Sequence, residues 1–360
     1  MKTLYKNGLL ARNGQLEKAD MLVENGKIVK IAPSISADAT VVDVHGKTVL
    51  PKLFDEHTHG SFGFEFNLAN LDEMKKVIDF YKEQKVGTVF PTLLTDTDDV
   101  IEKQILIIKE LSKEYPEVKG VHLEGPFLSK DYKGAMPEYL LQLPNIAFLE
   151  RMQKASGGFI KLMTLSPELP GSAEFVRQAV KIGVQINLGH SGATYAQTMA
   201  CVNAGATGFT HTFNAMKHMH QHELNIGGAA MLSDSYCEAI CDGLHLCPET
   251  VALLCKVKGL RRMIVVTDSI MAAGLPDGLY KLGVNDVVVK NGDARLLIGD
   301  TRAGSTLRAI DGLKNFAKFT GLPIEKAVIA MSENPARKHN LFDITGSLDE
   351  GKLAEFFIYE

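Results

Sequence analysis

Hydrophobic and polar positions follow two different rhythms along the 360-residue chain. In residues 1–50 short apolar runs are separated by turn residues, and "MLVENGKIVKI" places Asn25–Gly26 between two of them. Runs that alternate with a period of two are typical of strands, and Asn-Gly between them predicts a tight hairpin turn. His45–Gly46 reads as a second turn, so His45 is expected at the surface rather than among metal ligands. We therefore predict a small β unit at the N-terminus.

From residue 51 the rhythm changes to short apolar runs separated by helix-length amphipathic stretches such as "DEMKKVIDFYKEQKV". The runs are "LFDEHTH", "GTVFPTLL", "VKGVHLEG", "GFIKLMTLS", "GVQINLGHS", "ATGFTHTF", "YCEAICDG" and "RMIVVTDS". Nearly continuous apolar runs are typical of parallel strands that are covered on both faces. Eight such strands alternating with helices predict an α/β fold of the (β/α)8 type. A doubly wound open sheet gives a similar rhythm and stays open as an alternative.

The last third of the chain departs from this rhythm twice. "GLYKLGVNDVVVKNGDARLLIGDTRAGS" is strand-rich, with a turn at Asn291–Gly292, and is expected as an insertion between the eighth strand and its helix. The final stretch, "GSLDEGKLAEFFIYE", is again strand-like and can rejoin the N-terminal strands. The expected domains are a small β domain from residues 1–50 plus 344–360 and a barrel from residues 51–343.

Composition excludes several classes of function. With 45% hydrophobic and 23% charged residues and a net charge of −4, the chain has ordinary globular composition, and nothing indicates a nucleic-acid partner or an anionic membrane. No apolar run reaches transmembrane length, and the N-terminus lacks the apolar core of a secretion signal. The five cysteines are an odd number, which suits a reducing cytoplasm better than a disulfide framework. Cys237, Cys241 and Cys247 match no zinc-binding spacing and are expected to be buried small hydrophobes.

Polar residues gather where the apolar runs end. Those able to bind a metal or move a proton are His57, His59, Glu124, His190, His211 and Asp268. In a (β/α)8 barrel the carboxyl ends of the strands line one mouth, and residues two apart on a strand share a face. Imidazole and carboxylate ligands suit Zn²⁺ or Fe²⁺ in a hydrolytic site. A single His-x-His pair is more often a turn or a hydrogen-bonded core pair, so the prediction depends on the joint pattern.

Two further groups of histidines are left open. His122 shares a strand face with Glu124 and is expected as a core residue or as a support for a ligand. His218, His220 and His222 lie in "NAMKHMHQHELN", which lacks strand character and is expected as a loop over the mouth. Surface histidines and a substrate-facing loop are equally good interpretations of these three.

Several motifs together resemble one family over nearly the whole chain. They are "LPKLFDEHTHG", "HLEGPF", "LGHSGAT", "THTFNAM", "CDGLHL", "VTDSIMAAGL", "DTRAGS" and "SENPAR". In these stretches the chain resembles the N-acetylglucosamine-6-phosphate deacetylases of the amidohydrolase superfamily. The resemblance implies a TIM-like (β/α)8 barrel, a small β-sandwich domain formed by both chain termini, and a homodimer.

The resemblance also implies roles for individual residues. Glu124, His190 and His211 match the metal triad of the family, and His57 and His59 match the pair found in members that hold a second metal. One or two divalent ions are therefore implied, with Zn²⁺ expected before Fe²⁺, and Asp268 matches the general base and acid. The implied substrate-binding residues are Ala135, Asn214, Ala215, His222, His245, Arg302, Ala303 and Gly304.

The implied reaction is metal-dependent hydrolysis of the acetamide of N-acetylglucosamine 6-phosphate to glucosamine 6-phosphate and acetate. Two departures favour an alternative substrate, an N-acetylated sugar or small N-acyl compound without phosphate. Met136 stands where the family has a histidine, and a thioether cannot donate a hydrogen bond. His222 stands where the family has an arginine, whose charge is permanent. A non-catalytic metal-binding sugar sensor is a further hypothesis, but such a protein would be expected to lack Asp268 or a ligand.

Overall fold

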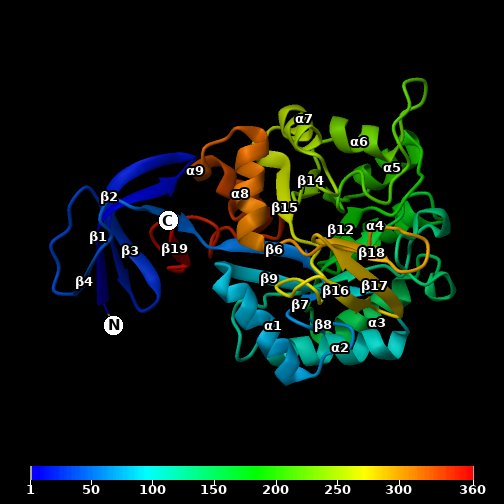
Figure 1. Ribbon diagram of the computed structural model, residues 1–360, viewed down its shortest axis with the longest axis horizontal. Coiled ribbons are helices and arrows are strands. Elements are labelled where there is room, and N and C mark those ends of the chain that lie inside the picture. Colours follow the sequence, from blue (N-terminus) through cyan, green and yellow to red (C-terminus); the bar gives the residue numbers. More distant parts are fainter. Residues whose placement is uncertain (1, 360) are drawn as a thin grey trace.

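The computed structural model describes residues 2–359 and contains a barrel beside a separate β-sheet (Figure 1). The barrel is one sheet of eight neighbouring parallel strands. In order along the sheet they are β6 (Leu53–Thr58), β9 (Val86–Leu94), β10 (Val121–Glu124), β11 (Ile160–Leu165), β12 (Gln185–Leu188), β13 (Gly208–Phe209), β14 (Tyr236–Ile240) and β15 (Met263–Val266). Each of the eight predicted runs coincides with one of these strands to within a few residues, so the prediction of a (β/α)8 barrel is confirmed.

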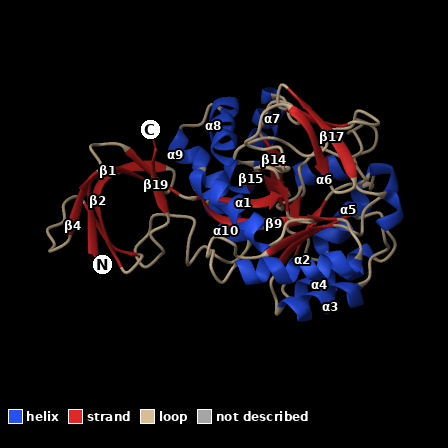
Figure 2. Cartoon of the chain, turned by 60° about the horizontal axis from the view of Figure 1, so that its bottom comes forward, coloured by secondary structure: helices blue, strands red, loops and turns tan. Residues whose placement is uncertain are grey.

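A helix follows each barrel strand and packs outside the sheet (Figure 2). These helices are α1 (Leu71–Glu83), α2 (Asp98–Leu111), α3 (Ile146–Ser156), α4 (Ser172–Lys181), α5 (Tyr195–Asn203), α6 (Ile226–Leu232), α7 (Pro248–Lys258) and α8 (Ala309–Thr320). The sequence explains where α1 begins, because Asn70 accepts from the Asp72 and Glu73 amides while Glu73 bonds back to the Asn70 amide. The buried positions of α1, Met74, Val77, Ile78 and Tyr81, repeat at helical spacing and face the sheet.

Hydrogen bonds join the first and last barrel strands. The Asp268 amide donates to the His57 carbonyl at 2.9 Å, and the Thr267 hydroxyl donates to Asp55 at 2.6 Å. Burial raises the pKa of the Asp55 carboxyl to about 7, although the bonds from Thr267 oppose this shift. The closure places Asp268 directly beside His57 at the mouth.

The predicted insertion after the eighth strand is a three-stranded antiparallel sheet of β16 (Gly278–Leu282), β17 (Asn285–Lys290) and β18 (Asp293–Leu296). Its turn at Asn291–Gly292 has φ of 52° and 76°, a left-handed pair that suits Asn and Gly. A small hairpin, β7 (Gly60–Ser61) and β8 (Phe64–Glu65), lies between β6 and α1. The chain ends with the short helices α9 (Ile324–Ala327) and α10 (Glu333–Lys338) before its last strand.

The separate sheet has six strands drawn from both ends of the chain. They are β1 (Lys2–Arg12), β2 (Gln15–Glu24), β3 (Lys27–Ala32), β4 (Thr40–Asp43), β5 (Thr48–Pro51) and β19 (Phe356–Tyr359). The predicted hairpin at Asn25–Gly26 joins β2 to β3, and β19 pairs antiparallel with β5. An apolar cluster of its own, which includes Leu10, Met21 and Val49, fills this unit. The limits 1–50 plus 344–360 and 51–343 stay predictions.

Two expectations from composition can be compared with the structure. Within residues 2–359, helices are too short or too polar to cross a membrane. Cys237 and Cys241 are buried free thiols, as expected, and Cys201 and Cys255 are buried as well. Cys247 is exposed, which corrects the expectation, because it precedes Pro248 at the surface-facing start of α7.

Candidate active site

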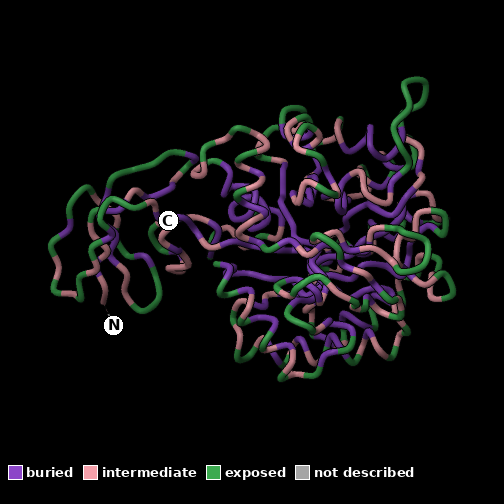
Figure 3. The backbone as a smooth tube through the Cα atoms, in the orientation of Figure 1, coloured by how far each residue is buried: buried purple, intermediate pink, exposed green. Residues whose placement is uncertain are grey.

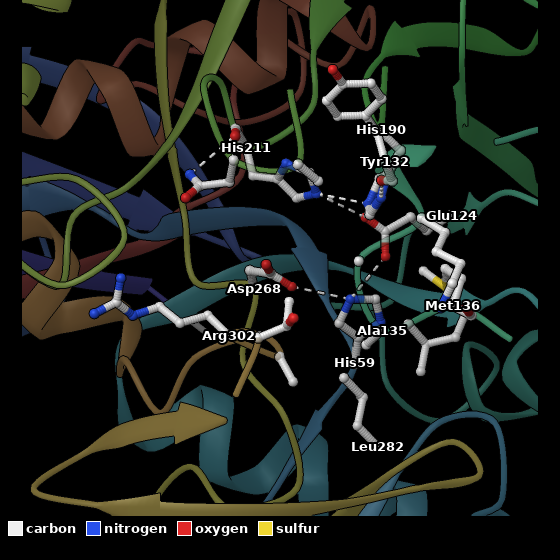
Figure 4. A pocket seen from close by; sticks show the side chains of 18 of the residues that line it. His59, Glu124, Tyr132, Ala135, Met136, His190, His211, Asp268, Leu282 and Arg302 are labelled. Carbon is white, nitrogen blue, oxygen red and sulfur yellow. Dashed lines mark hydrogen bonds and ion pairs between the residues drawn. The ribbon is translucent and has the colours of Figure 1, made fainter. Parts of the chain in front are cut away.

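The barrel mouth brings the six predicted metal-binding and catalytic residues together. His57 lies on β6 and Glu124 on β10. The other four lie within two residues of a strand end: His59 after β6, His190 after β12, His211 after β13 and Asp268 after β15. Figure 4 shows His59, Glu124, His190, His211 and Asp268 pointing toward one another. All six side chains are buried. The strand-end pattern in the sequence therefore corresponds to one cluster in space.

Glu124 stands at the centre of this cluster, between two groups of histidines. Its Oε1 lies 3.1 Å from His190 Nε2 and 3.2 Å from His211 Nε2. Its Oε2 lies 3.3 Å from His59 Nε2, and His57 Nε2 is 3.5 Å from Oε1. Two sets therefore have the spacing to hold a metal ion, His57–His59–Glu124 and Glu124–His190–His211, and they share one carboxylate.

Hydrogen bonds on the far side of three imidazoles turn their Nε2 atoms toward the cluster. His190 Nδ1 lies 2.9 Å from the Tyr132 carbonyl, His59 Nδ1 3.3 Å from the Thr92 carbonyl, and His57 Nδ1 3.0 Å from Glu238. A carbonyl or carboxylate can only accept, so each Nδ1 carries a hydrogen. Burial lowers the pKa of His57 and His59, but the nearby Asp268 and Glu124 carboxylates outweigh it and raise both, that of His59 to about 9, so without a metal ion these two Nε2 atoms are protonated as well. A bound metal ion would take the place of that proton and leave each ring neutral, with its lone pair on Nε2.

The convergence of these Nε2 atoms indicates that a cation fits this site. His190 Nε2 and His211 Nε2 are 3.0 Å apart, and both lie within 3.2 Å of Glu124 Oε1. Within residues 2–359, His57 Nε2 is buried without a hydrogen-bond partner. Buried polar atoms are rarely left without a partner, so an unpaired imidazole nitrogen next to a carboxylate is well suited to bind a metal.

Electrostatics keep the two carboxyl groups of the cluster ionised. Burial favours the neutral form of Glu124, but the charge of His57 and the neighbouring imidazoles outweigh it and hold its pKa well below the ordinary value. Burial also opposes ionisation of Asp268, and the charge of His57 together with a hydrogen bond from His59 lowers its pKa. Asp268 is therefore a carboxylate near neutral pH, which is the form that can accept a proton.

The backbone is strained where the strands end. His190, His211, Ala215 and Asp268 have φ of 49°, 29°, 49° and 50°, a left-handed region that residues with a Cβ rarely adopt. Such residues cost on the order of 1–3 kcal/mol each and are found mainly at functional sites. The strain sets the direction in which three of the six clustered side chains leave the barrel.

A cavity of about 470 Å³ opens above the cluster. Of the predicted substrate-binding residues, those that line it are Ala135, Asn214, Ala215, His245, Arg302, Ala303 and Gly304. Lys130 and Lys133 add positive charge to its wall, whereas Leu94, Met136 and Leu282 form an apolar part. His57 lies beneath the cavity and does not line it, because its side chain is fully buried.

The loop with three histidines lies beside this cavity rather than in its wall. Residues 217–224 are all exposed and form the projecting segment between α5 and α6 (Figure 3). His222 is among them, and this loop lines a second hollow that shares Tyr132 with the first. Asn225 fixes the base of the loop, because its side-chain Nδ2 donates to the backbone carbonyls of Lys217 and His218.

Sequence reasoning missed three residues that hold the cluster in place. Tyr132 contributes its carbonyl to His190, and backbone atoms leave no signal in a sequence. Glu238 contacts His57, and Asn187 in turn donates to Glu238 at 2.6 Å. A carboxylate inside the apolar run "YCEAI" was the available signal, because a charge in a buried strand requires a partner. His122 has its expected supporting place, bonded to Thr92 and Thr164 below His57.

Comparisons with known proteins agree with this geometry. The sequence pattern of the Amidohydrolase family matches residues 48–360. An N-acetylgalactosamine-6-phosphate deacetylase of Escherichia coli O157:H7 is 31% identical, over 96% of this chain and 92% of that protein. An N-acetylglucosamine-6-phosphate deacetylase of Bacillus subtilis is 29% identical, over 97% of this chain and 91% of that protein.

Solved structures are similar over the whole length. N-acetylglucosamine-6-phosphate deacetylase of Thermotoga maritima has a TM-score of 0.89 and 32% identity, covering 99% of this chain and 95% of that one. A mutant of the Mycobacterium smegmatis enzyme, in complex with N-acetyl-D-glucosamine-6-phosphate, has a TM-score of 0.93 and 29% identity, covering 100% and 95%. The matched pattern spans both the barrel and its clustered ligands, and the chain belongs to the amidohydrolase family.

Proposed function

We propose that this protein hydrolyses the acetamide of N-acetylglucosamine 6-phosphate to glucosamine 6-phosphate and acetate. The observation that carries the proposal is the place of Asp268, whose Oδ1 lies 3.1 Å from His59 Nε2 and 3.5 Å from His57 Nε2. A proton acceptor thus stands beside two potential metal sites at the base of a cavity of sugar-phosphate size. Relatives with the corresponding deacetylase names support the choice of substrate.

The donor set indicates which residues would hold metal. Glu124, His190 and His211 would hold one divalent ion, and His57 and His59 would hold a second beside the same carboxylate. Nitrogen and oxygen donors favour Zn²⁺, with Fe²⁺ as the alternative. A bound divalent ion polarises a carbonyl and lowers the pKa of a bound water from 15.7 toward about 7.

The residues of the chain account for the proton transfers. Asp268, ionised because its pKa is lowered, accepts a proton from the water that attacks the acetyl carbon. When the carbon–nitrogen bond breaks, protonated Asp268 returns this proton to the leaving nitrogen, which departs as an amine. The bond that forms is carbon to oxygen, so the products are acetate and the amino sugar.

The cavity wall supplies groups that suit a sugar phosphate. His245 Nδ1 lies 2.6 Å from Asp242, which orients the ring so that its other nitrogen is free for the substrate. Lys130 and Lys133 add cations, with Lys130 Nζ 3.5 Å from the exposed Glu138 and Lys133 Nζ donating to the Met136 carbonyl at 3.3 Å. Arg302 is engaged with Asp293 at 2.9 Å. We propose that His245, Asn214 and these lysines compensate for the absence of an arginine at position 222.

The proposal is tested by measuring acetate release from the zinc-loaded protein. N-acetylglucosamine 6-phosphate, N-acetylgalactosamine 6-phosphate and unphosphorylated N-acetylglucosamine are compared in parallel. We expect the first to have the highest kcat/KM, at least about tenfold above that of the unphosphorylated sugar. Two hydrogen bonds from charged groups to the phosphate, at about 1.5 kcal/mol or more each, are together worth more than the roughly 1.4 kcal/mol that corresponds to tenfold. Equal turnover of the unphosphorylated sugar would favour the alternative substrate that Met136 suggests. If none of the three sugars is hydrolysed, the proposal is wrong.

We further propose that the protein is a homodimer. The exposed loop of residues 217–224 bears His222, which lies outside the cavity of its own chain although the family resemblance places it at the substrate. A partner loop would bring this histidine to the cavity from outside. Light scattering after size exclusion should give about twice the 39.3 kDa of one chain, and a monomeric mass would contradict the proposal.

A further inference from the structure

Glu238 is a buried carboxylate between the two potential metal sites. It lies on β14, inside the barrel, and is 1% exposed. Neither of the two ligand sets includes it. A charge in this position requires hydrogen-bond partners, and each of its carboxylate oxygens has at least one.

One of these partners belongs to the first ligand set. Glu238 Oε2 accepts from His57 Nδ1 at 3.0 Å, which leaves the lone pair of His57 on Nε2, facing Glu124 and Asp268. A carboxylate on the far side of an imidazole also increases the basicity of the ring, and so strengthens its bond to a metal. Glu238 therefore determines both the direction and the donor strength of His57.

A second partner belongs to the other ligand set. The same Oε2 accepts from the backbone amide of His211 at 3.0 Å, and the Thr212 amide donates to the Glu238 carbonyl at 2.9 Å. His211 has a φ of 29°, a strained conformation that persists only where its neighbours hold it. One carboxylate oxygen thus restrains a ligand from each set.

A third partner makes a conservative variant possible. Glu238 Oε1 accepts from Asn187 Nδ2 at 2.6 Å, and Asn187 Oδ1 is buried without a partner within residues 2–359. If Glu238 is replaced by glutamine, Asn187 can turn its amide and accept from the new amide group. The glutamine oxygen then still accepts from His57 and His211, so only the negative charge is lost.

We propose that Glu238 is the positioning residue that links the two metal sites, by holding the His57 ring and the His211 backbone with one carboxylate. The inference rests on the proposed function only in assuming that these histidines bind a metal. It assigns Glu238 no contact with the substrate, and its effect is exerted through His57 and His211.

The test is zinc affinity, measured by competition with a chromophoric chelator in the absence of any sugar. Glu238→Ala should weaken zinc binding about 10- to 100-fold, the usual effect of removing a group that orients a ligand. Glu238→Gln should weaken it less, because the geometry is kept and only the charge is lost. Asp20→Asn is the matched control, a buried carboxylate of the separate sheet that accepts from the Asn7 and Ile35 amides.

A double variant distinguishes positioning from general damage to the fold. In a His57→Gln background the larger part of the Glu238→Ala effect should disappear, since the ring through which it acts is gone. An undiminished loss in that background, or wild-type zinc affinity in Glu238→Ala, would overturn the proposal. If Glu238→Ala does not fold, Glu238→Met, which fills similar space without the carboxylate acceptor, replaces it, and wild-type zinc affinity in that variant would overturn the proposal. Because no sugar is present, a wrong substrate assignment leaves this result unaffected.

Discussion

Asp268 combines three properties that its position at the end of β15 creates. Its backbone amide donates to the His57 carbonyl, and its strained φ of 50° turns the side chain into the mouth. Its carboxylate then lies within 3.5 Å of two imidazole nitrogens, which keep it ionised despite burial. A residue held in this way is suited to carry a proton between water and a leaving group, and unsuited to a purely structural role.

Replacement of this single carboxylate should separate chemistry from binding. Asp268→Asn keeps the shape but cannot accept a proton, so we expect kcat for acetate release to fall by about 10²- to 10⁴-fold, with KM changed much less. Steady-state kinetics on N-acetylglucosamine 6-phosphate check this. Asp286→Asn, an exposed change on β17, is the control and should retain wild-type rates. A kcat near the wild-type value for Asp268→Asn would exclude this residue as the base.

At the scale of elements, Glu65 ties the inserted sheet to the barrel. The carboxylate at the end of β8 accepts from the Gly283 amide, in the turn between β16 and β17, at 2.8 Å. Burial raises the pKa of Glu65 to about 7, although this hydrogen bond opposes the shift. The inserted sheet carries Leu282, which lines the cavity, so its attachment contributes to the shape of the site.

This raised pKa predicts how stability changes with pH. The folded protein keeps the Glu65 proton up to about pH 7, whereas the unfolded chain releases it near 4.5, so the folded state binds more protons between these values. Its stability must therefore fall as pH rises through this window, by about 2 kcal/mol between pH 5.5 and 8. Asp55, whose pKa is also raised to about 7, contributes a loss of the same sign, so urea unfolding at both pH values should show a loss about 2 kcal/mol smaller in Glu65→Gln than in the wild type. An equal loss in both proteins would contradict the prediction.

The elements also show what a sequence can and cannot predict. The eight barrel strands were predictable because buried parallel strands produce apolar runs, and Asn25–Gly26 and Asn291–Gly292 because their left-handed turns favour those residues. The clustering of Glu124 with the histidines followed from the shared mouth of a barrel. The contacts of Glu238 and the place of His222 did not, since both depend on three-dimensional packing and loop direction that no local pattern records.

At the scale of the whole molecule, a second buried polar group lies outside the lining of the cavity. Glu56 on the first barrel strand is fully buried and contacts Lys338 and His339, from the other end of the barrel sequence. The Lys338 side chain is also fully buried. Burial raises the pKa of Glu56, but the charge of Lys338 together with His339 outweighs this effect and holds the pKa far below its ordinary value. These contacts span more than 280 residues and join α10 to β6 inside the barrel.

Replacing one member of this pair should lower the free energy of unfolding far more than replacing both members together. Lys338→Met or Glu56→Gln alone leaves a buried group without its partner, and we expect each to lower the free energy of unfolding by about 3–5 kcal/mol. The double variant Glu56→Gln/Lys338→Met removes both charges and should recover much of that loss. Urea denaturation of the four proteins measures the coupling, with the exposed pair Lys281–Asp286 as a control worth less than about 1 kcal/mol. Additive losses in the double variant would show that the two charges do not act as a pair. A recovered stability would mean that each buried charge matters only through its partner, and that packing which does not need this ion pair brings the end of the barrel sequence back to its beginning.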